Sequence, residues 1–320
     1  MKPTVYISYN LPKEWLAKLE THCALIRHKK NAPPPRAEFL KKAKKADGVL
    51  AILNEKIDKE FFATCPRLRI IANYAIGYDN VDLAAAKKHN VPVSNTPGDF
   101  ATVVAEFAMG MMLSLAKRFE AGDNFMHAGK YTHWDPLLLL GGDMKGKTIG
   151  IIGTGRIGSA LVRIAQGGFD MKVLYNDVRR NPEIEKQYKA KKVPVNTLLK
   201  QADFVSLHVP LLPSTHHLIG KKELSLMKKT AILVNTSRGP VIDEKALVRA
   251  LKKKQIAGAG IDVYEHEPAM SPGLGKLENA ITTPHIASAT ESARRQMADI
   301  AIENLLDVLV RGKQPRNQVK

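Results

Sequence analysis

KTIGIIGTGRIGSALVRIA, residues 147–165, is the stretch that decides the fold. A run rich in β-branched residues leads into glycines 153, 155 and 158, spaced G-x-G-x-x-G, and an amphipathic segment follows. A strand that turns through such glycines into a helix is typical of a dinucleotide-binding loop. Gly153 allows the tight turn, Gly155 lets a pyrophosphate approach the backbone, and Gly158 lets the helix pack closely on the strand. We therefore expect a parallel α/β sheet around this unit.

An acidic residue stands where such a loop predicts one. Asp177 ends the next strand pattern, MKVLYND, 19 positions after Gly158. A carboxylate at this place accepts hydrogen bonds from the ribose hydroxyls of NAD. Arg179 and Arg180 follow at once, and an arginine here could instead pair with the 2′-phosphate of NADP. We expect NAD as the cofactor, with NADP as the alternative.

The rest of the chain repeats the same alternation of strand and helix patterns. Between residues 4 and 97, short β-branched runs alternate with amphipathic stretches, and a second series starts at Lys147. This pattern predicts an α/β protein with two doubly wound parallel-sheet domains. The stretch from Ala101 to Phe125 reads as one helical pattern with a long apolar face, which could bridge domains or subunits. Near the end, ESARRQMADIAIENLLDVLV predicts a final amphipathic helix.

Composition limits the class of protein. The chain has 320 residues, of which 44% are hydrophobic and 25% charged, and this fits about two ordinary globular domains. Its apolar stretches stop short of the roughly 18 to 20 residues that span a membrane. The N-terminus lacks a signal-type apolar core, so we expect a cytoplasmic location. Cys23 and Cys65 lack the spacing of a metal site or a disulfide framework, so we expect two core residues and no metal.

The net charge of +18 has two interpretations. It comes from short lysine clusters such as residues 41–45 and 252–254. A basic surface can attract nucleic acid or an acidic membrane, but these clusters are dispersed and have no aromatic residues between them. We expect a solvated lysine-rich surface with no nucleic-acid or membrane partner, although its field could still concentrate anionic ligands.

Three later segments place chemically active side chains after predicted strands. Arg238 follows a strand in NTSRGPVID, Glu267 follows the next in GIDVYEHEP, and His285 follows another in ITTPHIASAT. Taken singly, each has another interpretation: Arg238 as an ion-pair partner, Glu267 as a turn residue and His285 as a core histidine. Together they fit one crevice, because doubly wound sheets gather their strand ends at one edge. A cation and a tuned proton donor are what hydride transfer to a 2-oxo acid needs besides its cofactor.

These motifs together resemble those of the D-2-hydroxyacid dehydrogenase family. The resemblance rests on GTGRIG, NTSRGPVIDEKALVRAL, GIDVYEHEP and TPHIASAT, with NYAIGYDNVD and NTPGDFATVVAE before them, and it covers nearly the whole chain in order. It implies a Rossmann cofactor domain, residues 99–287, inserted in a flavodoxin-like substrate domain, residues 1–98 with 288–320. It further implies a hinge that closes a cleft, and a homodimer joined through the region after Ala101.

The resemblance also implies a role for each site residue. His285 would be the general acid and base, Glu267 would pair with its ring, and Arg238 would bind the substrate carboxylate and carbonyl oxygen. The backbone around Ile76 and Gly77 would donate N–H groups to the same carboxylate. The residues expected to contact the dinucleotide are Gly153, Gly155, Arg156, Ile157, Gly158, Asp177, Pro210, Thr236 and, at the nicotinamide end, Asp262.

Within this family, reduction of glyoxylate or hydroxypyruvate fits best. His285 stands where formate-oxidising relatives carry glutamine, and Ile76 where phosphite-oxidising relatives carry lysine. The runner-up is a D-lactate-type or D-3-phosphoglycerate dehydrogenase, although the regulatory C-terminal domain of many phosphoglycerate enzymes is not in this sequence. From another class, an NAD-sensing corepressor or scaffold is the alternative.

Trp134 has two interpretations. In related reductases an aromatic residue near this position can reach the neighbour's site, and plain interface packing is the other interpretation.

Overall fold

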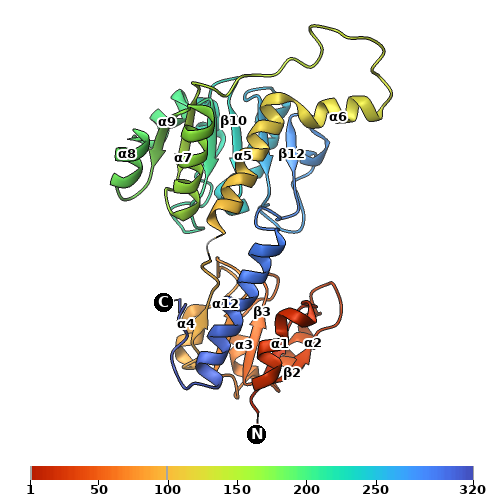
Figure 1. Ribbon diagram of the computed structural model, residues 1–320, viewed down its shortest axis with the longest axis vertical. Coiled ribbons are helices and arrows are strands. Elements are labelled where there is room, and N and C mark those ends of the chain that lie inside the picture. The colour runs from red at the N-terminus through yellow and green to blue at the C-terminus, as the bar shows by residue number, and fades with distance from the viewer. Residues whose placement is uncertain (1, 99, 320) are drawn as a thin grey trace. The chain divides into compact units, whose positions relative to one another are not determined.

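The computed structural model describes residues 2–98 and 100–319, which form two compact units. One unit holds residues 2–98 and 290–319, and the other holds residues 100–289 (Figure 1). The sequence places its two domain boundaries after residues 98 and 287. Residue 99, where the second predicted domain begins, lies outside the described residues.

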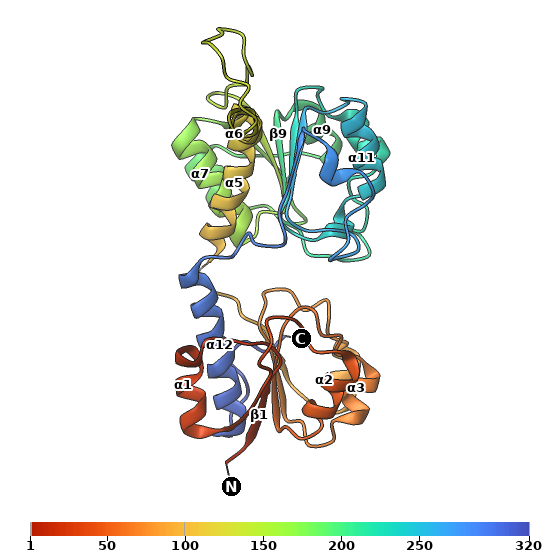
Figure 2. The ribbon, with the colours of Figure 1, turned by 90° about the vertical axis from the view of Figure 1, so that its right-hand side faces the viewer.

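The first unit is a five-stranded parallel sheet in the order β2-β1-β3-β4-β5. Helices α1 and α12 cover one face of the sheet, and α2 and α3 cover the other (Figure 2). This strand order is that of flavodoxin-like folds, as predicted. The elements are β1 (Thr4–Ile7), α1 (Lys13–His22), β2 (Ala24–Arg27), α2 (Arg36–Ala43), β3 (Gly48–Ala51), α3 (Lys59–Thr64), β4 (Ile70–Asn73), α4 (Leu83–Lys88), β5 (Val93–Ser94) and α12 (Glu291–Leu309).

The second unit is a seven-stranded parallel sheet in the order β12-β11-β10-β9-β6-β7-β8. The chain order reverses between β6 and β9, which is the switch point where doubly wound sheets bind ligands. The elements are α5 (Ala101–Lys117), α6 (Phe119–His127), β6 (Thr148–Ile152), α7 (Arg156–Phe169), β7 (Lys172–Asn176), α8 (Pro182–Tyr188), β8 (Lys191–Lys192), α9 (Val195–Gln201), β9 (Phe204–Leu207), α10 (Lys221–Leu226), β10 (Ile232–Asn235), η1 (Gly239–Val241), α11 (Glu244–Lys252), β11 (Gly258–Ile261), η2 (Leu274–Lys276) and β12 (Ala280–Thr282).

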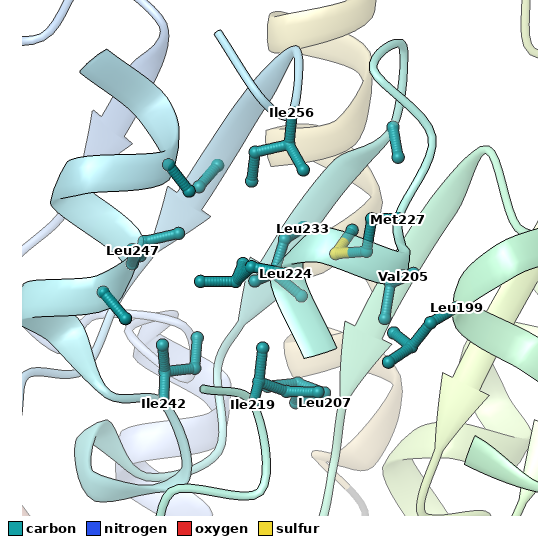
Figure 3. Close-up of a cluster of buried hydrophobic side chains, with 14 of the residues drawn as sticks. Leu199, Val205, Leu207, Ile219, Leu224, Met227, Leu233, Ile242, Leu247 and Ile256 are labelled. Carbon is teal, nitrogen blue, oxygen red and sulfur yellow. The ribbon is translucent and has the colours of Figure 1, made fainter. Parts of the chain in front are cut away.

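The central strands of this second sheet are buried on both faces. Every residue of β9, β10 and β11 is buried, as expected for strands that carry helices on both sides. Leu207 and Leu233 face a cluster that Leu224 and Leu247 close from α10 and α11 (Figure 3). Full burial of each such side chain contributes about 1.5–3 kcal/mol. The sheet is therefore a rigid base for the loops at its edge.

The stretch from Ala101 to Phe125 is two helices instead of the one that the sequence predicts. Helix α5 ends at Lys117, and Arg118 takes the left-handed conformation with φ 60°. Helix α6 starts at Phe119 and buries none of its residues. An α-helix cannot continue through a left-handed residue. The apolar pattern of the sequence continues past Arg118, but the helix ends there, so the prediction of one helix is wrong.

The cysteines lie in the core, as predicted. Cys23 and Cys65 are both buried and both free. Burial raises the pKa of the Cys65 thiol to about 11, so it stays protonated and unreactive at neutral pH.

Among the described residues, no helix combines the length and apolarity needed to cross a membrane. No group of three or more His, Cys, Asp or Glu within residues 2–98 and 100–319 is placed to hold a metal ion.

Glu55 is a buried carboxyl group in the first unit. Its residue is only 5% exposed, and its Oε2 accepts a hydrogen bond of 2.6 Å from the backbone N–H of Ile52. Burial raises the pKa of Glu55 to about 7, although the Ile52 N–H and the Ser8 hydroxyl favour the ionised form. The folded chain therefore holds a proton that an unfolded chain releases nearer pH 4.5.

We predict that Glu55→Gln removes a pH dependence of stability. Because the pKa in the folded state is above the unfolded value, the stabilisation is complete below pH 4.5 and is lost as pH rises through about 7. Glutamine keeps an acceptor for Ile52 and does not titrate. Urea unfolding at pH 5 and pH 8 should show the wild-type chain losing about 2 kcal/mol more than the variant between these pH values. Equal losses in both proteins would mean that Glu55 is already ionised at pH 5.

Candidate active site

The turn between β6 and α7 needs glycine at two positions. Gly153 has φ 92°, and a Cβ there would lie 2.6 Å from the backbone oxygen of His208. A Cβ on Gly158 would lie 2.1 Å from the backbone oxygen of Gly153, because α7 starts directly against the turn. A Cβ on Gly155 would meet no atom within 4 Å. The turn thus leaves open space at Gly155, where a phosphate group would approach the backbone.

The N-terminus of α7 is open to an anion. No side chain caps the helix at Gly155, and both Gly155 and Arg156 are exposed, while Ile157 is half-buried. The first N–H groups of a helix have no partner within the helix and carry a partial positive charge. The open space and the free helix end together fit the pyrophosphate of a dinucleotide.

Asp177 lies beside the turn between β6 and α7, which together with the open N-terminus of α7 forms the dinucleotide cradle. Its Oδ2 accepts hydrogen bonds from the backbone N–H of Thr154 at 2.7 Å and from the Thr154 hydroxyl at 3.1 Å. Burial works to raise the pKa of Asp177, but the hydrogen bonds from Thr154 and Arg179 outweigh it and lower the pKa. The carboxylate is therefore charged near neutral pH, which favours ribose hydroxyls and repels a 2′-phosphate.

The two arginines after Asp177 differ in what they contact. The guanidinium of Arg180 pairs with the carboxylate of Glu185 at 2.7 Å. The Arg179 backbone N–H donates to Asp177 at 3.3 Å, and the residue is exposed. Of the two, Arg179 is thus the one available to a 2′-phosphate.

Pro210 and Thr236 follow the carboxyl ends of β9 and β10. Strand β9 lies beside β6 in the sheet, and β10 lies on the other side of β9. Pro210 is exposed, and its backbone oxygen accepts from the Thr215 hydroxyl at 2.6 Å. Thr236 is buried, and its hydroxyl has no hydrogen-bond partner among the described residues. A buried hydroxyl without a partner is costly, so a bound ligand would supply what the protein does not.

His285 and Glu267 form a hydrogen-bonded pair. The His285 Nδ1 lies 3.0 Å from Glu267 Oε2, and Glu267 Oε1 accepts the backbone N–H of Tyr264 at 3.1 Å. Burial works to raise the pKa of Glu267, but His285, the Tyr264 N–H and the charge of Arg238 together lower it. An ionised carboxylate on Nδ1 orients the ring and leaves Nε2 available for proton transfer.

Asp262 holds the loop that carries His285. The Asp262 carboxylate is completely buried and accepts the Thr283 hydroxyl at 2.6 Å and the N–H groups of Ile286 and Ala287 at 2.8 and 2.9 Å. His285 sits in this loop at φ 55°, a left-handed conformation that costs roughly 1–2 kcal/mol. The contact of Asp262 with the nicotinamide end stays a prediction, whereas its bonds to the loop were missed from the sequence.

Asn235 is a second residue that sequence reasoning missed. Its Nδ2 donates to the backbone oxygen of Arg238 at 2.9 Å, and its Oδ1 accepts from the N–H and the hydroxyl of Ser237. These bonds shape the turn that carries Arg238 after β10. An asparagine at a strand end is a frequent turn residue, and this was the available signal.

The predicted catalytic residues lie in one unit, and the predicted backbone contacts to the substrate carboxylate lie in the other. Arg238, Glu267 and His285 follow β10, β11 and β12, which are neighbours in the second sheet. Ile76 and Gly77 lie in the first unit, in the loop after β4. The second unit alone thus combines a dinucleotide cradle with a guanidinium and an acid–base pair at one edge of one sheet.

This chain is similar to known proteins over nearly its whole length. Residues 109–287 match the family model described as D-isomer specific 2-hydroxyacid dehydrogenase, NAD binding domain. A glyoxylate reductase of Korarchaeum cryptofilum is 44% identical over 321 residues, which cover 100% of this chain and 96% of that protein. The crystal structure of a glyoxylate reductase from Paecilomyes thermophila is 30% identical with a TM-score of 0.87, and the match covers 99% of this chain and 98% of that one. An acyclic imino acid reductase in complex with NADPH and D-Arg is 28% identical with a TM-score of 0.87, over 99% of this chain and 100% of that one.

Two glycines of α7 give a matched test of the cradle. Gly158→Ala should destabilise the chain by about 1–3 kcal/mol, because the new methyl group meets a backbone oxygen. Gly167→Ala in the same helix has open space and should stabilise it by up to about 1 kcal/mol. Urea unfolding measures both changes. Equal stabilisation by the two substitutions would show that α7 does not approach the turn as described.

Proposed function

Because the chain belongs to the D-isomer specific 2-hydroxyacid dehydrogenase family, we propose that it reduces glyoxylate, and hydroxypyruvate with it, using NADH. Membership makes it an oxidoreductase with an NAD-binding domain. The observation that carries the proposal is the His285–Glu267 pair, with Arg238 close enough to lower the pKa of Glu267. A relative of nearly the same length that is named glyoxylate reductase supports the choice of substrate.

In the proposed reaction, the protein holds the acid and supplies the proton. A bound NADH provides a hydride for C2 of the 2-oxo acid. Arg238 binds the carboxylate and polarises the carbonyl oxygen, since a guanidinium presents a planar fork of donors. Protonated His285 gives its Nε2 proton to that oxygen, so a hydride and a proton together convert the carbonyl to a hydroxyl. Glu267 orients the ring throughout.

The dinucleotide would be held by the open end of α7 and by Asp177. The ionised Asp177 carboxylate supports NAD over NADP, because it would repel a 2′-phosphate. The exposed Arg179 supports NADP as a second cofactor. In this proposal the first unit binds substrate, with the backbone N–H groups of Ile76 and Gly77 on the carboxylate.

A homodimer is also part of the proposal. The segment from α6 to residue 140 exposes large apolar side chains, which a single chain leaves in water and a partner subunit would cover. These are Phe119 at 62%, Met126 at 59%, Trp134 at 76%, Leu137 at 72% and Leu140 at 67% exposed. Trp134, the most exposed of these side chains, would pack in this interface or reach the neighbour's site. A cytoplasmic location is part of the same proposal.

We predict that a double substitution, Leu137→Asp with Leu140→Asp, dissociates this dimer. Two buried charges at an apolar interface cost far more than the interface can offset. Light scattering should give twice the chain mass of 35.3 kDa for the wild-type protein and the single chain mass for the variant. Val178→Asp, at an exposed site outside this segment, is the control that stays dimeric. A wild-type protein of single mass would overturn the proposal.

The test of the activity follows the absorbance of NADH, and separately of NADPH, during turnover. Glyoxylate, hydroxypyruvate, pyruvate and a bulkier 2-oxo acid are offered in turn. We expect fast turnover with the first two and a preference for NADH. Preferred turnover of pyruvate would point to the D-lactate-type alternative. No turnover with any acid, while NADH still binds, would support the scaffold alternative instead.

In the same assay, His285→Gln should lower kcat by about 10²–10⁴-fold, because glutamine cannot act as the acid. The affinity for NADH, measured by fluorescence, should stay within about twofold, since the cradle at α7 is unchanged. His22→Gln, an exposed histidine of the first unit, is the control with unchanged turnover. Parallel losses of turnover and NADH affinity would remove His285 from the proton-transfer role.

A further inference from the structure

The backbone carbonyl groups of the loop after β4 accept hydrogen bonds from within the first unit. The Ala75 oxygen accepts the N–H of Thr96 at 2.9 Å, and the Tyr78 oxygen accepts the N–H of Val81 at 3.0 Å. Between these two, the carbonyl oxygens of Ile76 and Gly77 accept from asparagine side chains instead of from backbone N–H groups. Side-chain amides thus complete the hydrogen bonding of this loop.

Two asparagines hold the two central carbonyl groups. Asn95 Nδ2 donates to the Ile76 oxygen at 2.7 Å, and Asn73 Nδ2 donates to the Gly77 oxygen at 2.8 Å. Asn73 is the last residue of β4 and is completely buried, whereas Asn95 follows β5 and is half-buried. The loop is therefore attached to the ends of two neighbouring strands.

A third asparagine connects this loop to the turn after β3. The Asn73 and Asn80 amides exchange hydrogen bonds of 3.3 and 3.2 Å. Asn80 Nδ2 also donates to the backbone oxygens of Ile52 and Glu55, at 3.2 and 3.0 Å. Three strand ends are thus linked through side-chain amides, and a network satisfied in this way is rigid.

The fixed carbonyl groups determine where the N–H groups point. In a trans peptide the C=O of one residue and the N–H of the next point in opposite directions. Since the oxygens of Ala75, Ile76 and Gly77 are bonded inward, the N–H groups of Ile76, Gly77 and Tyr78 turn away from the unit. Within residues 2–98 and 100–319, none of these three N–H groups has an acceptor in the protein. Successive N–H groups of this kind form a site for an anion.

We infer that Asn73, Asn80 and Asn95 are positioning residues for the substrate carboxylate. They fix the backbone so that the N–H of Tyr78, besides those of Ile76 and Gly77, is a donor to it. The inference rests on the proposed function, since a 2-oxo acid supplies the carboxylate. Donors held in place before binding need no ordering when the acid arrives, so their fixation favours affinity for the acid and leaves the dinucleotide cradle untouched.

The test compares three substitutions of Asn95, which is half-buried, whereas Asn73 is completely buried. Asn95→Ala removes the donor, Asn95→Asp replaces the donor with a negatively charged acceptor of the same shape, and Asn95→Gln keeps an amide on a longer side chain. The readouts are the KM for glyoxylate, the inhibition constant of oxamate as a non-reacting carboxylate, kcat, and the dissociation constant of NADH. Asn10→Ala is the matched control, because the Asn10 side-chain amide in the same unit donates a hydrogen bond of 2.9 Å to Asn31 Oδ1, away from the loop.

We predict that Asn95→Ala and Asn95→Asp raise the KM for glyoxylate and the oxamate inhibition constant by about tenfold, the factor expected for one hydrogen bond to a charged group. The affinity for NADH should change by less than about twofold, and Asn95→Gln should recover part of the loss. A merely structural role would instead lower thermal stability and leave the ratio of KM to kcat unchanged. Asn80→Ala gives a second measurement of the same constants. If that variant does not fold, the Asn95 variants alone decide whether the inference holds.

Two negative results have different meanings. A wild-type protein that turns over no 2-oxo acid would overturn the proposed function, and the inference with it. An active wild-type protein whose Asn95 variants keep KM and oxamate inhibition within about twofold of the Asn10→Ala control would overturn the inference alone.

Discussion

Parallel strands need a helical crossover between them, so their carboxyl ends all meet at one edge of the sheet. This constraint positions every candidate functional group of the chain. In the second unit the glycine turn follows β6, Asp177 follows β7, and Arg238 follows β10. In the first unit the loop of Ile76 and Gly77 follows β4 in the same way. The apolar helices that cover both faces of each sheet make the edge rigid, and the loops take their positions from it.

Short polar side chains at the strand ends then shape the loops. Asp262 holds the loop of His285, Asn235 shapes the turn of Arg238, and Asn73 bonds the loop of Gly77. Asp262 and Asn73 are completely buried, and each is satisfied by backbone groups of the loop that it holds together with one side chain, the Thr283 hydroxyl for Asp262 and the Asn80 amide for Asn73. A buried polar group without partners costs free energy, so these side chains and loops fix each other. Unusual backbone conformations such as that of His285 persist because such bonds surround them.

Burial alone does not decide which carboxyl groups of this protein ionise. Desolvation raises the pKa of Glu55, and the hydrogen bond from the Ile52 N–H does not offset it. For Glu267 and Asp177, hydrogen bonds outweigh desolvation, with the charges of His285 and Arg238 adding to the effect at Glu267, so both pKa values are lowered. The lysine-rich surface, with a net charge of +18, further favours anionic ligands at long range. The balance between desolvation and hydrogen bonding thus differs from one carboxyl group to the next.

The sequence by itself determined the features that depend on local sterics and on short repeats. The spacing of Gly153 and Gly158 predicts the turn because only glycine fits there, and the alternation of apolar runs predicts two parallel sheets. The order of Arg238, Glu267 and His285 after successive strands predicts that they share an edge, since chain direction alone requires it. Tertiary structure decided what depends on distances between remote residues. Four features leave no periodic signal in the sequence. They are the break at Arg118, the hydrogen bonds from Asp262 to a loop more than twenty residues away, the raised pKa of Glu55, and the amide network of Asn73 and Asn80. Each of them exists only because folding brings particular donors, acceptors and apolar surfaces within a few ångströms of one another.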